Sequence, residues 1–265
     1  MARMSIIESI ILGFIQGATE FIPISSSGHL VVAQYFLSGA SDHLFLEWIN
    51  IGTLLALVVY FWPKIMTIAD DILVQHNYRL ARNILITAIP AGLVGYFAAD
   101  FIDSNQFFGS VIVVVVMSAL VGVLMIILEK LPKASPVKNG EALSPLRALA
   151  IGLAQTVALI PGTSRSGATI IAGRLSGLTA KEAAEYSFLA SLPIMAGVTF
   201  KVFLHDHTYL YQNFGTLLIA NFVAFVSGLL AVGFLMRYLA SHSLAVFGWY
   251  RVVMAVVVIT FVLVQ

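Results

Sequence analysis

Residues 16–30 read QGATEFIPISSSGHL, a stretch unlike the apolar sequence on either side of it. It combines a glutamine, a glutamate, three consecutive serines and a histidine around a central proline. Because proline ends or kinks a helix, two helices separated by a short polar break are predicted. The apolar limbs, 5–21 and 28–36, are each short for crossing a bilayer, which takes about 20 helical residues. The pattern therefore predicts a re-entrant hairpin whose turn lies at membrane depth.

A second stretch, residues 155–169 (QTVALIPGTSRSGAT), echoes the first with an arginine among its serines. Identical residues recur at an offset of 139, namely Gly13 and Gly152, Gln16 and Gln155, Ser25 and Ser164, Ser27 and Ser166, and Gly28 and Gly167. These matches predict a single membrane domain, 1–265, built from internal repeats 1–129 and 145–265. The polar loop 130–144, which contains proline and glycine, would join the two halves.

Composition indicates a polytopic membrane protein. Of the 265 residues, 60% are hydrophobic and 10% are charged, against roughly 25% charged in an ordinary soluble domain. The net charge of +1 gives no reason to expect a nucleic-acid partner. The absence of cysteine excludes disulfides and thiolate chemistry. The N-terminal residues carry no signal-peptide pattern.

Three apolar segments follow each broken segment. They are 48–61, 84–101 and 111–128 after the first, and 183–203, 214–238 and 244–264 after the second, which covers 146–175. Lys and Arg occur in the loops at 63–82 and 130–147 and are absent from those at 38–42, 103–109 and 205–213. By the positive-inside rule the first set is cytoplasmic and the second external.

The predicted fold is an all-α polytopic membrane protein with an inverted-topology repeat. Each half would consist of a re-entrant helical hairpin plus three transmembrane helices. One hairpin and three crossings leave the chain on the side opposite its start, so the second copy enters inverted. Repeats of this kind place their chemistry near the midplane, where the two breaks meet.

The residues at these breaks suit an anionic, phosphorylated ligand. After each proline a new helix starts, and its first N–H groups and dipole attract anions. Arg165 can hold phosphate oxygens bidentately. Glu20 and His29 are a candidate acid–base pair, and the serines beside them are candidate nucleophiles or phosphate donors. Structural roles remain alternatives: the serines can cap helices, and Gln16 can form a helix–helix hydrogen bond.

The two motifs, Q-x-x-x-E-F-I-P-I-S-S-S-G-H and P-G-T-S-R-S-G-A-T, resemble those of the bacterial undecaprenyl-diphosphate phosphatases associated with bacitracin resistance. The resemblance covers essentially the whole chain. It implies a multi-pass enzyme of the bacterial inner membrane that removes the terminal phosphate of a C55 isoprenyl diphosphate, recycling the lipid carrier for peptidoglycan synthesis. It also implies a divalent cation, magnesium or alternatively calcium, and an active site facing the outer, periplasmic side.

The resemblance and the chemistry of the residues together give individual residues their expected roles. The expected catalytic residues are Glu20, Ser26, His29 and Arg165. The expected substrate-binding residues are Ser25, Ser27, Ser164, Ser166, Gly167 and Thr169. Glu20, with Gln16, is expected to hold the metal; the family's motif has Glu or Gln at the Gln16 position, and Gln weakens mechanisms that need two carboxylates.

Two questions stay open from the sequence. Ser26, activated by His29, would form a transient phosphoserine, or a water deprotonated by His29 would attack directly. A transporter or flippase for an anionic lipid or phosphorylated solute is the alternative function, because broken inverted repeats are also a transporter architecture. The sequence does not distinguish a monomer from a homodimer.

Overall fold

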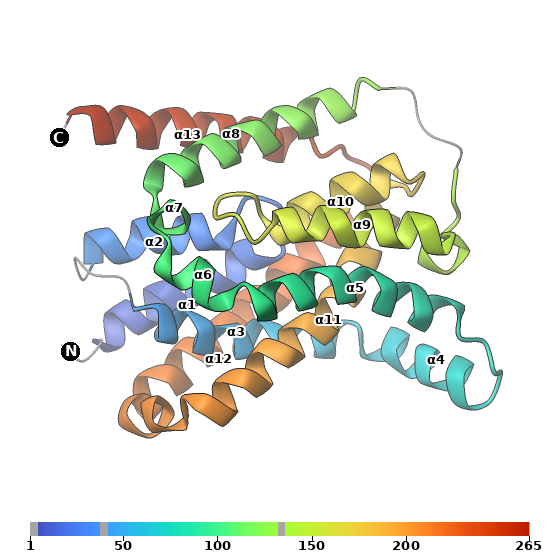
Figure 1. Cartoon of the computed structure of the whole chain (residues 1–265), viewed down its shortest axis with the longest axis horizontal. Coiled ribbons are helices and arrows are strands. Elements are labelled where there is room, and N and C mark those ends of the chain that lie inside the picture. The colour runs from blue at the N-terminus through green and yellow to red at the C-terminus, as the bar shows by residue number, and fades with distance from the viewer. Residues whose placement is uncertain (1–4, 38–41, 132–135, 265) are drawn as a thin grey trace.

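The computed structural model describes residues 5–37, 42–131 and 136–264, and this part of the chain is helical without any strand (Figure 1). The helices are α1 (Ile6–Glu20), α2 (Ser26–Leu37), α3 (His43–Tyr60), α4 (Trp62–Leu73), α5 (Arg79–Phe97), α6 (Ala99–Ser104), α7 (Gln106–Gly109), α8 (Val111–Leu128), the 3₁₀ turn η1 (Gly140–Ala142), α9 (Pro145–Val157), α10 (Arg165–Leu175), α11 (Ala180–His205), α12 (His207–Tyr238) and α13 (Ala245–Val264).

The lengths and compositions of the helices confirm a polytopic membrane protein. Among the described residues, α5, α8, α11 and α12 are each long and apolar enough to cross a membrane. Helices α3 and α4 pass the same test together and are bent by 68° at their junction, which makes a fifth candidate span. The described apolar stretch of α13, Ala245–Phe261, is shorter than a full span.

The two predicted breaks are present as turns between consecutive helices. A capping box between Ser5 and Glu8 starts α1, and the turn at 21–25, which contains Pro23, separates it from α2. In the second half Ser144 caps α9, Pro145 occupies its first turn, and residues 158–164 lead into α10. In Figure 1, α1 enters from the left and α9 from the right, and both end near the middle of the molecule.

Glycines let helix backbones approach closely at corresponding places. Helix α1 packs on α12, where a Cβ at Gly13 would collide with the carbonyl of Ala220. Helix α9 packs on α5, where a Cβ at Gly152 would lie 2.7 Å from the carbonyl oxygen of Thr87. Both contacts therefore require glycine at positions that the sequence matches at an offset of 139.

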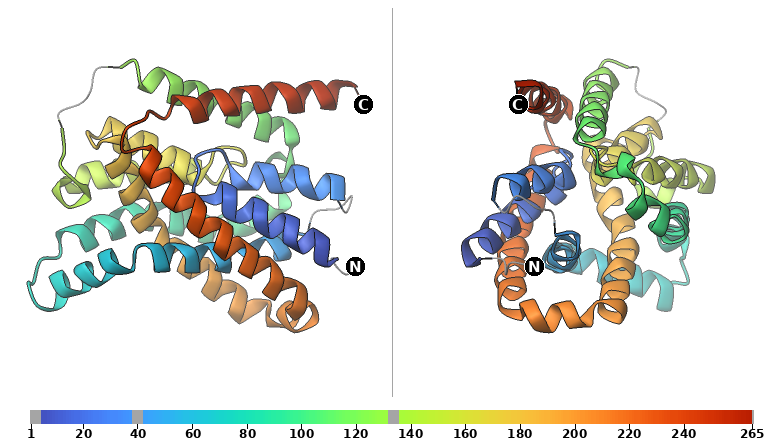
Figure 2. Two further views of the ribbon diagram at one scale, coloured as in Figure 1. Left: turned by 180° about the vertical axis from the view of Figure 1, so that it is seen from behind. Right: turned by 60° about the vertical axis from the view of Figure 1, so that its left-hand side comes forward.

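Helices α8 and α13 form a further close pair at one edge of the molecule (Figure 2). At their crossing, a Cβ at Gly122 would lie 2.7 Å from the carbonyl oxygen of Gly248, and a Cβ at Gly248 would lie 2.6 Å from that of Gly122. Small residues at such crossings are typical of helix packing in membranes. The pair brings α13, the last helix of the chain, beside the two hairpin turns.

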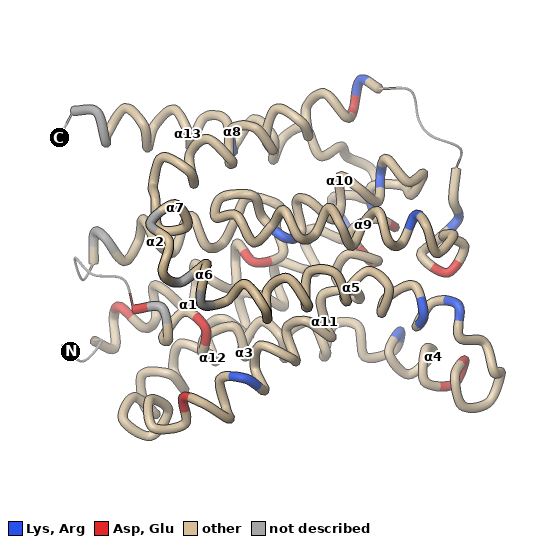
Figure 3. Tube along the Cα trace, in the orientation of Figure 1, with Lys and Arg blue, Asp and Glu red and all other residues tan. Residues whose placement is uncertain are grey.

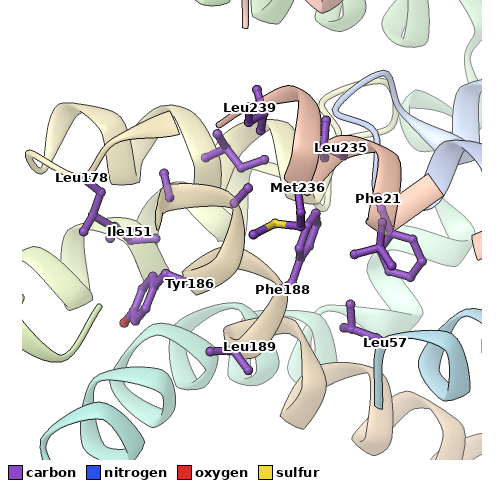
Figure 4. Close-up of a cluster of buried hydrophobic side chains, with 14 of the residues drawn as sticks. Phe21, Leu57, Ile151, Leu178, Tyr186, Phe188, Leu189, Leu235, Met236 and Leu239 are labelled. Carbon is purple, nitrogen blue, oxygen red and sulfur yellow. The ribbon is translucent and has the colours of Figure 1, made fainter. Parts of the chain in front are cut away.

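The largest apolar core extends to the first turn (Figure 4). Phe21 follows Glu20 directly, is 1% exposed, and packs edge-on against Phe188 of α11, with ring centroids 5.6 Å apart. Leu235, Met236 and Leu239 belong to the same cluster. Burial of an aromatic ring immediately after Glu20 fixes where this carboxylate can lie.

The prediction of a loop at 63–82 was wrong for most of this range. Residues Trp62–Leu73 form α4, whose side chains are all at least partly exposed. The apolar residues between the charged residues Lys64, Asp70 and Asp71 give the segment an amphipathic helical pattern, which the prediction did not take into account. The loops predicted at 103–109 and 205–213 are also largely helical, in α6, α7 and the start of α12. Residues 38–41 of the predicted loop 38–42 lie outside the described part.

Charged residues lie mostly toward the two ends of the helices (Figure 3). Lys and Arg gather at the end that carries the α4–α5 junction and the start of α9, on the right of the figure. A few charges remain in the middle, where the two turns meet.

Candidate active site

The turns of the two hairpins are joined by an ion pair. Nη2 of Arg165, the first residue of α10, lies 2.5 Å from Oε1 of Glu20, the last residue of α1. The side chains are 23% and 12% exposed, respectively. The predicted meeting of the acidic and basic motifs is therefore present in the structure.

The second oxygen of Glu20 accepts two hydrogen bonds. Ser26 Oγ donates to Glu20 Oε2 at 2.6 Å, and Gln16 Nε2 donates to it at 3.3 Å. Gln16 Nε2 also donates to Asn50 Oδ1 of α3 at 2.7 Å. Glu20 thus brings Ser26, Arg165 and Gln16 together in one polar cluster. Gln155, which corresponds to Gln16, donates instead to the carbonyl of Thr87, so the two halves differ in their chemistry.

Ser25 and Ser164 immediately precede α2 and α10, and both have a positive φ angle. Their φ angles are 74° and 70°, in the left-handed region that side chains other than glycine rarely adopt. Ser25 Oγ lies 3.3 Å from Ser27 Oγ, and Ser164 Oγ lies 3.2 Å from Ser166 Oγ. Strained backbone at two matched positions is typical of a functional site.

The remaining residues of the second motif support α10. Ser164 caps this helix by accepting a hydrogen bond from Gly167 N at 3.2 Å. Thr169 is buried and donates to the carbonyl of Arg165 at 2.8 Å, and its Oγ1 also lies 2.5 Å from Ser187 Oγ. Ser166 Oγ lies 3.5 Å from the carbonyl oxygen of Glu20. These contacts hold Arg165 opposite Glu20.

His29 lies one turn along α2 from Ser26 but is bonded elsewhere. Its Nδ1 lies 2.8 Å from the carbonyl oxygen of Ser25, and its Nε2 lies 2.7 Å from the hydroxyl of Tyr250 on α13. Within the described part of the chain, no hydrogen bond joins His29 to Ser26, whose hydroxyl is directed to Glu20.

A buried arginine holds both turns in place. Arg251 of α13 is 0% exposed, and its Nη1 donates to the carbonyl of Pro23 in the first turn at 3.1 Å. Its Nη2 donates to the carbonyls of Gly162 and Thr163 in the second turn, at 2.5 and 3.1 Å. Its Nε donates to the carbonyl of Ser118 on α8 at 3.1 Å. One guanidinium therefore cross-links both hairpins to the α8–α13 pair.

The sequence analysis missed Asn50, Tyr250 and Arg251. Arg251 had a detectable signal, because a charged residue inside an apolar helix is costly and marks a built environment. Asn50 and Tyr250 carried no comparable signal, since a single asparagine or tyrosine in an apolar helix is common.

The polar cluster offers oxygen ligands for a hard cation. Among the described residues, no group of three or more His, Cys, Asp or Glu side chains could hold a metal. Glu20 and the amide oxygen of Gln16 are suitable donors, and magnesium is commonly bound by one or two carboxylates together with phosphate oxygens and water. The residues present therefore fit a cation that binds together with a phosphorylated substrate.

An apolar cleft of about 90 Å³ adjoins the polar cluster. It lies between α2, α8 and α13, and Val32, Val114, Met254 and Val258 are among its lining residues. Ser25 and His29 also line it, so the cleft connects to the polar residues at the start of α2.

The fold and the site define a polytopic membrane protein with an acid, an arginine and serines gathered between two broken helices. Comparison with known proteins agrees: the family model described as bacitracin resistance protein BacA matches residues 9–257. The chain belongs to this family.

The curated relatives match over nearly their whole lengths. The undecaprenyl-diphosphatase of Lactococcus lactis subsp. lactis (strain IL1403) is 36% identical, and the match covers 97% of each chain. The undecaprenyl-diphosphatase of Enterococcus faecalis is 34% identical over 97% of this chain and 96% of its own. That of Acinetobacter baumannii (strain ATCC 17978) is 35% identical over 98% and 96%. The names of these relatives describe a phosphatase, and nothing in the comparisons supports a transporter.

Proposed function

We propose that this protein is an undecaprenyl-diphosphate phosphatase that hydrolyses the terminal phosphate of its lipid substrate and thereby recycles the carrier for peptidoglycan synthesis. The curated relatives support the activity. The observation that carries the proposal for this chain is the contact of Glu20 with both Arg165 and Ser26. A cation and a hydroxyl at the starts of α10 and α2, with a carboxylate at the end of α1, can bind a diphosphate and cleave it.

Arg165 and the start of α10 would bind the diphosphate. The guanidinium is held at the first turn of this helix, where the dipole and free N–H groups favour anions. On binding, phosphate oxygens would replace the Glu20 carboxylate as partners of Arg165 and accept its hydrogen bonds bidentately. Ser25, Ser27, Ser164, Ser166 and Gly167 would bind around the same group, and Thr169 would hold the helix behind Arg165.

Ser26 would attack the terminal phosphorus. Its hydroxyl already donates to Glu20 Oε2, so Glu20 is placed to accept the proton as the oxygen–phosphorus bond forms. The bond from that phosphorus to the bridging oxygen breaks, and the isoprenyl monophosphate leaves. Water then hydrolyses the phosphoserine, and His29, one turn further along α2, would assist this step by proton transfer. Direct attack by water on the diphosphate is the alternative route.

Glu20 and Gln16 would hold the divalent cation, magnesium or calcium, which supplies charge neutralisation at the phosphate oxygens when bound. The start of the isoprenyl chain would lie in the apolar cleft between α2, α8 and α13, which Ser25 and His29 also line. The rest of the C55 chain is soluble in the lipid and needs no enclosed tunnel.

The architecture that we propose is an inverted repeat in the bacterial inner membrane. Three observations support it: the matched contacts of Gly13 and Gly152, the positive φ angles of both Ser25 and Ser164, and the entry of α1 and α9 from opposite ends. The gathering of Lys and Arg at one end of the helices supports an orientation with that end in the cytoplasm. The site would then open to the outer, periplasmic side.

The direct test is release of inorganic phosphate from undecaprenyl diphosphate by the purified protein in detergent, with magnesium and with a chelator. Ser26→Ala should abolish turnover and the acid-stable phosphoenzyme if the serine route operates, whereas Ser104→Ala, at an exposed serine of α6, should match the wild type. Substantial turnover by Ser26→Ala would leave only the water route. No phosphate release by the wild type would refute the proposed function.

A further inference from the structure

In the described part of the structure, Tyr250 is the only residue of another helix that hydrogen-bonds to the His29 ring. Its hydroxyl lies 2.7 Å from Nε2, and the two rings are stacked, with centroids 5.7 Å apart and planes inclined by 11°. The two residues are separated by 221 positions in the chain. Tyr250 therefore contacts the His29 ring twice, through a hydrogen bond at Nε2 and through stacking on its face.

The hydrogen bonds assign one tautomer to His29. The carbonyl oxygen of Ser25 can only accept, so Nδ1, which lies 2.8 Å from it, carries the proton. In the neutral ring Nε2 is then the acceptor, and the Tyr250 hydroxyl is the donor that faces it. A phenol that donates to Nε2 keeps this nitrogen in its unprotonated form while the hydrogen bond is present.

The position of Tyr250 is itself fixed by the neighbouring residue. Arg251 binds the carbonyls of both turns and of Ser118, which sets the register of α13 against α2 and α8. Tyr250, Met254 and Val258 are spaced four residues apart, so they share one face of α13. Met254 and Val258 line the apolar cleft that His29 also lines, and Tyr250, one turn before Met254, contacts His29 itself.

We propose that Tyr250 is a positioning residue that holds His29 in the Nδ1-protonated tautomer, with Nε2 facing the Tyr250 hydroxyl beside the apolar cleft that His29 lines. This inference rests on the proposed phosphatase function. It goes beyond that function because it places the C-terminal helix in the catalytic arrangement. Tyr250 acts through His29 and not on the substrate.

Tyr250→Phe tests the proposal because it removes the hydroxyl and keeps the stacked ring. We expect kcat to fall by about 10-fold or more, as for other groups that orient a catalytic histidine, with KM and the melting temperature unchanged. The matched control is Tyr211→Phe, at a tyrosine of α12 that is 77% exposed, which should keep wild-type kcat. A wild-type kcat in Tyr250→Phe would overturn the proposal. So would a fall in kcat/KM that is due entirely to a higher KM.

Nitrogen NMR of the ¹⁵N-histidine-labelled protein tests the same contact without turnover. The His29 signals are identified by their absence in His29→Ala. Tyr250→Phe should change the ratio of the two His29 tautomers, and Tyr211→Phe should not. Unchanged His29 signals in Tyr250→Phe would overturn the positioning role whether or not the protein hydrolyses diphosphate, so failure of this inference is distinguishable from failure of the proposed function.

Discussion

The guanidinium of Arg165 and the carboxylate of Glu20 lie 2.5 Å apart, although 145 residues separate them in the chain. Each charge lies largely inside an apolar protein, where an unpaired ion is costly. The ion pair therefore stabilises the contact between the two turns as long as no other anion is present. A phosphate that competes for Arg165 would release Glu20 at the moment when Ser26 needs a proton acceptor.

Replacement of Arg165 should affect turnover more than folding. In Arg165→Lys the ammonium keeps the charge and loses the planar fork, so we expect kcat/KM for diphosphate hydrolysis to fall by about 10²-fold or more. Arg79→Lys, at an exposed arginine that starts α5, is the control and should match the wild type. Steady-state phosphate release measures both. A lysine variant with wild-type kcat/KM would show that bidentate binding at this position is dispensable.

Loss of the Arg251 guanidinium should destabilise the protein. In Arg251→Met an apolar side chain replaces the guanidinium, so the backbone carbonyls that it binds lose their hydrogen-bond donor. Each buried polar group left without a partner lowers the free energy of unfolding by about 1–3 kcal/mol. The expected result is a lower melting temperature in detergent together with lost activity, while Arg79→Met changes neither. Arg251→Lys, which can reach fewer of the carbonyls, should lie between. An unchanged melting temperature in Arg251→Met would contradict a stabilising role for the contacts of Arg251 with the two turns.

Replacement by alanine should have opposite effects on stability at two glycines of the packed helices α5 and α9. At Gly152 the new Cβ would lie 2.7 Å from the carbonyl oxygen of Thr87, so Gly152→Ala must separate the helices and should cost about 1–3 kcal/mol. At Gly92 no heavy atom lies within 4 Å of the new Cβ, and Gly92→Ala should be neutral or stabilising by up to about 1 kcal/mol. Thermal unfolding of both variants measures the contrast. Equal melting temperatures would argue against close packing of α9 on α5.

The orientation can be read by thiol labelling, because the chain contains no cysteine. A cysteine introduced at Ser104, which is exposed at the end of α6, should react with an impermeant reagent on intact cells. A cysteine at Lys138, exposed in the loop between the halves, should react only after permeabilisation. The opposite pattern would invert the proposed orientation.

The sequence predicted the parts of the site that carry local signals. Pro23 and Pro161, with polar residues in apolar surroundings, indicated the breaks, and the matched serines indicated that the breaks correspond. The meeting of Glu20 with Arg165 followed from that correspondence, and the structure contains it.

The rest depended on contacts that no local pattern encodes. The expected partner of Ser26 was His29, but the serine hydroxyl is bonded to Glu20, and His29 is bonded to Tyr250. Residues three apart on one helix share a face without necessarily bonding, and packing of α13 decided the direction of the imidazole. The segment that forms α4 was predicted as part of the loop 63–82, although its alternation of charged and apolar residues also fits an amphipathic helix.

The attachment of both turns to Arg251 has a consequence for biosynthesis. The ribosome delivers the chain from its N-terminus, so the two serine-rich turns are inserted well before the residue that cross-links them. Until α13 is in place, the carbonyls of Pro23, Gly162 and Thr163 lack this donor, and a nascent chain has not yet acquired the geometry for hydrolysis. The cross-linked site can therefore assemble only after α13, which follows both turns in the chain, has been inserted.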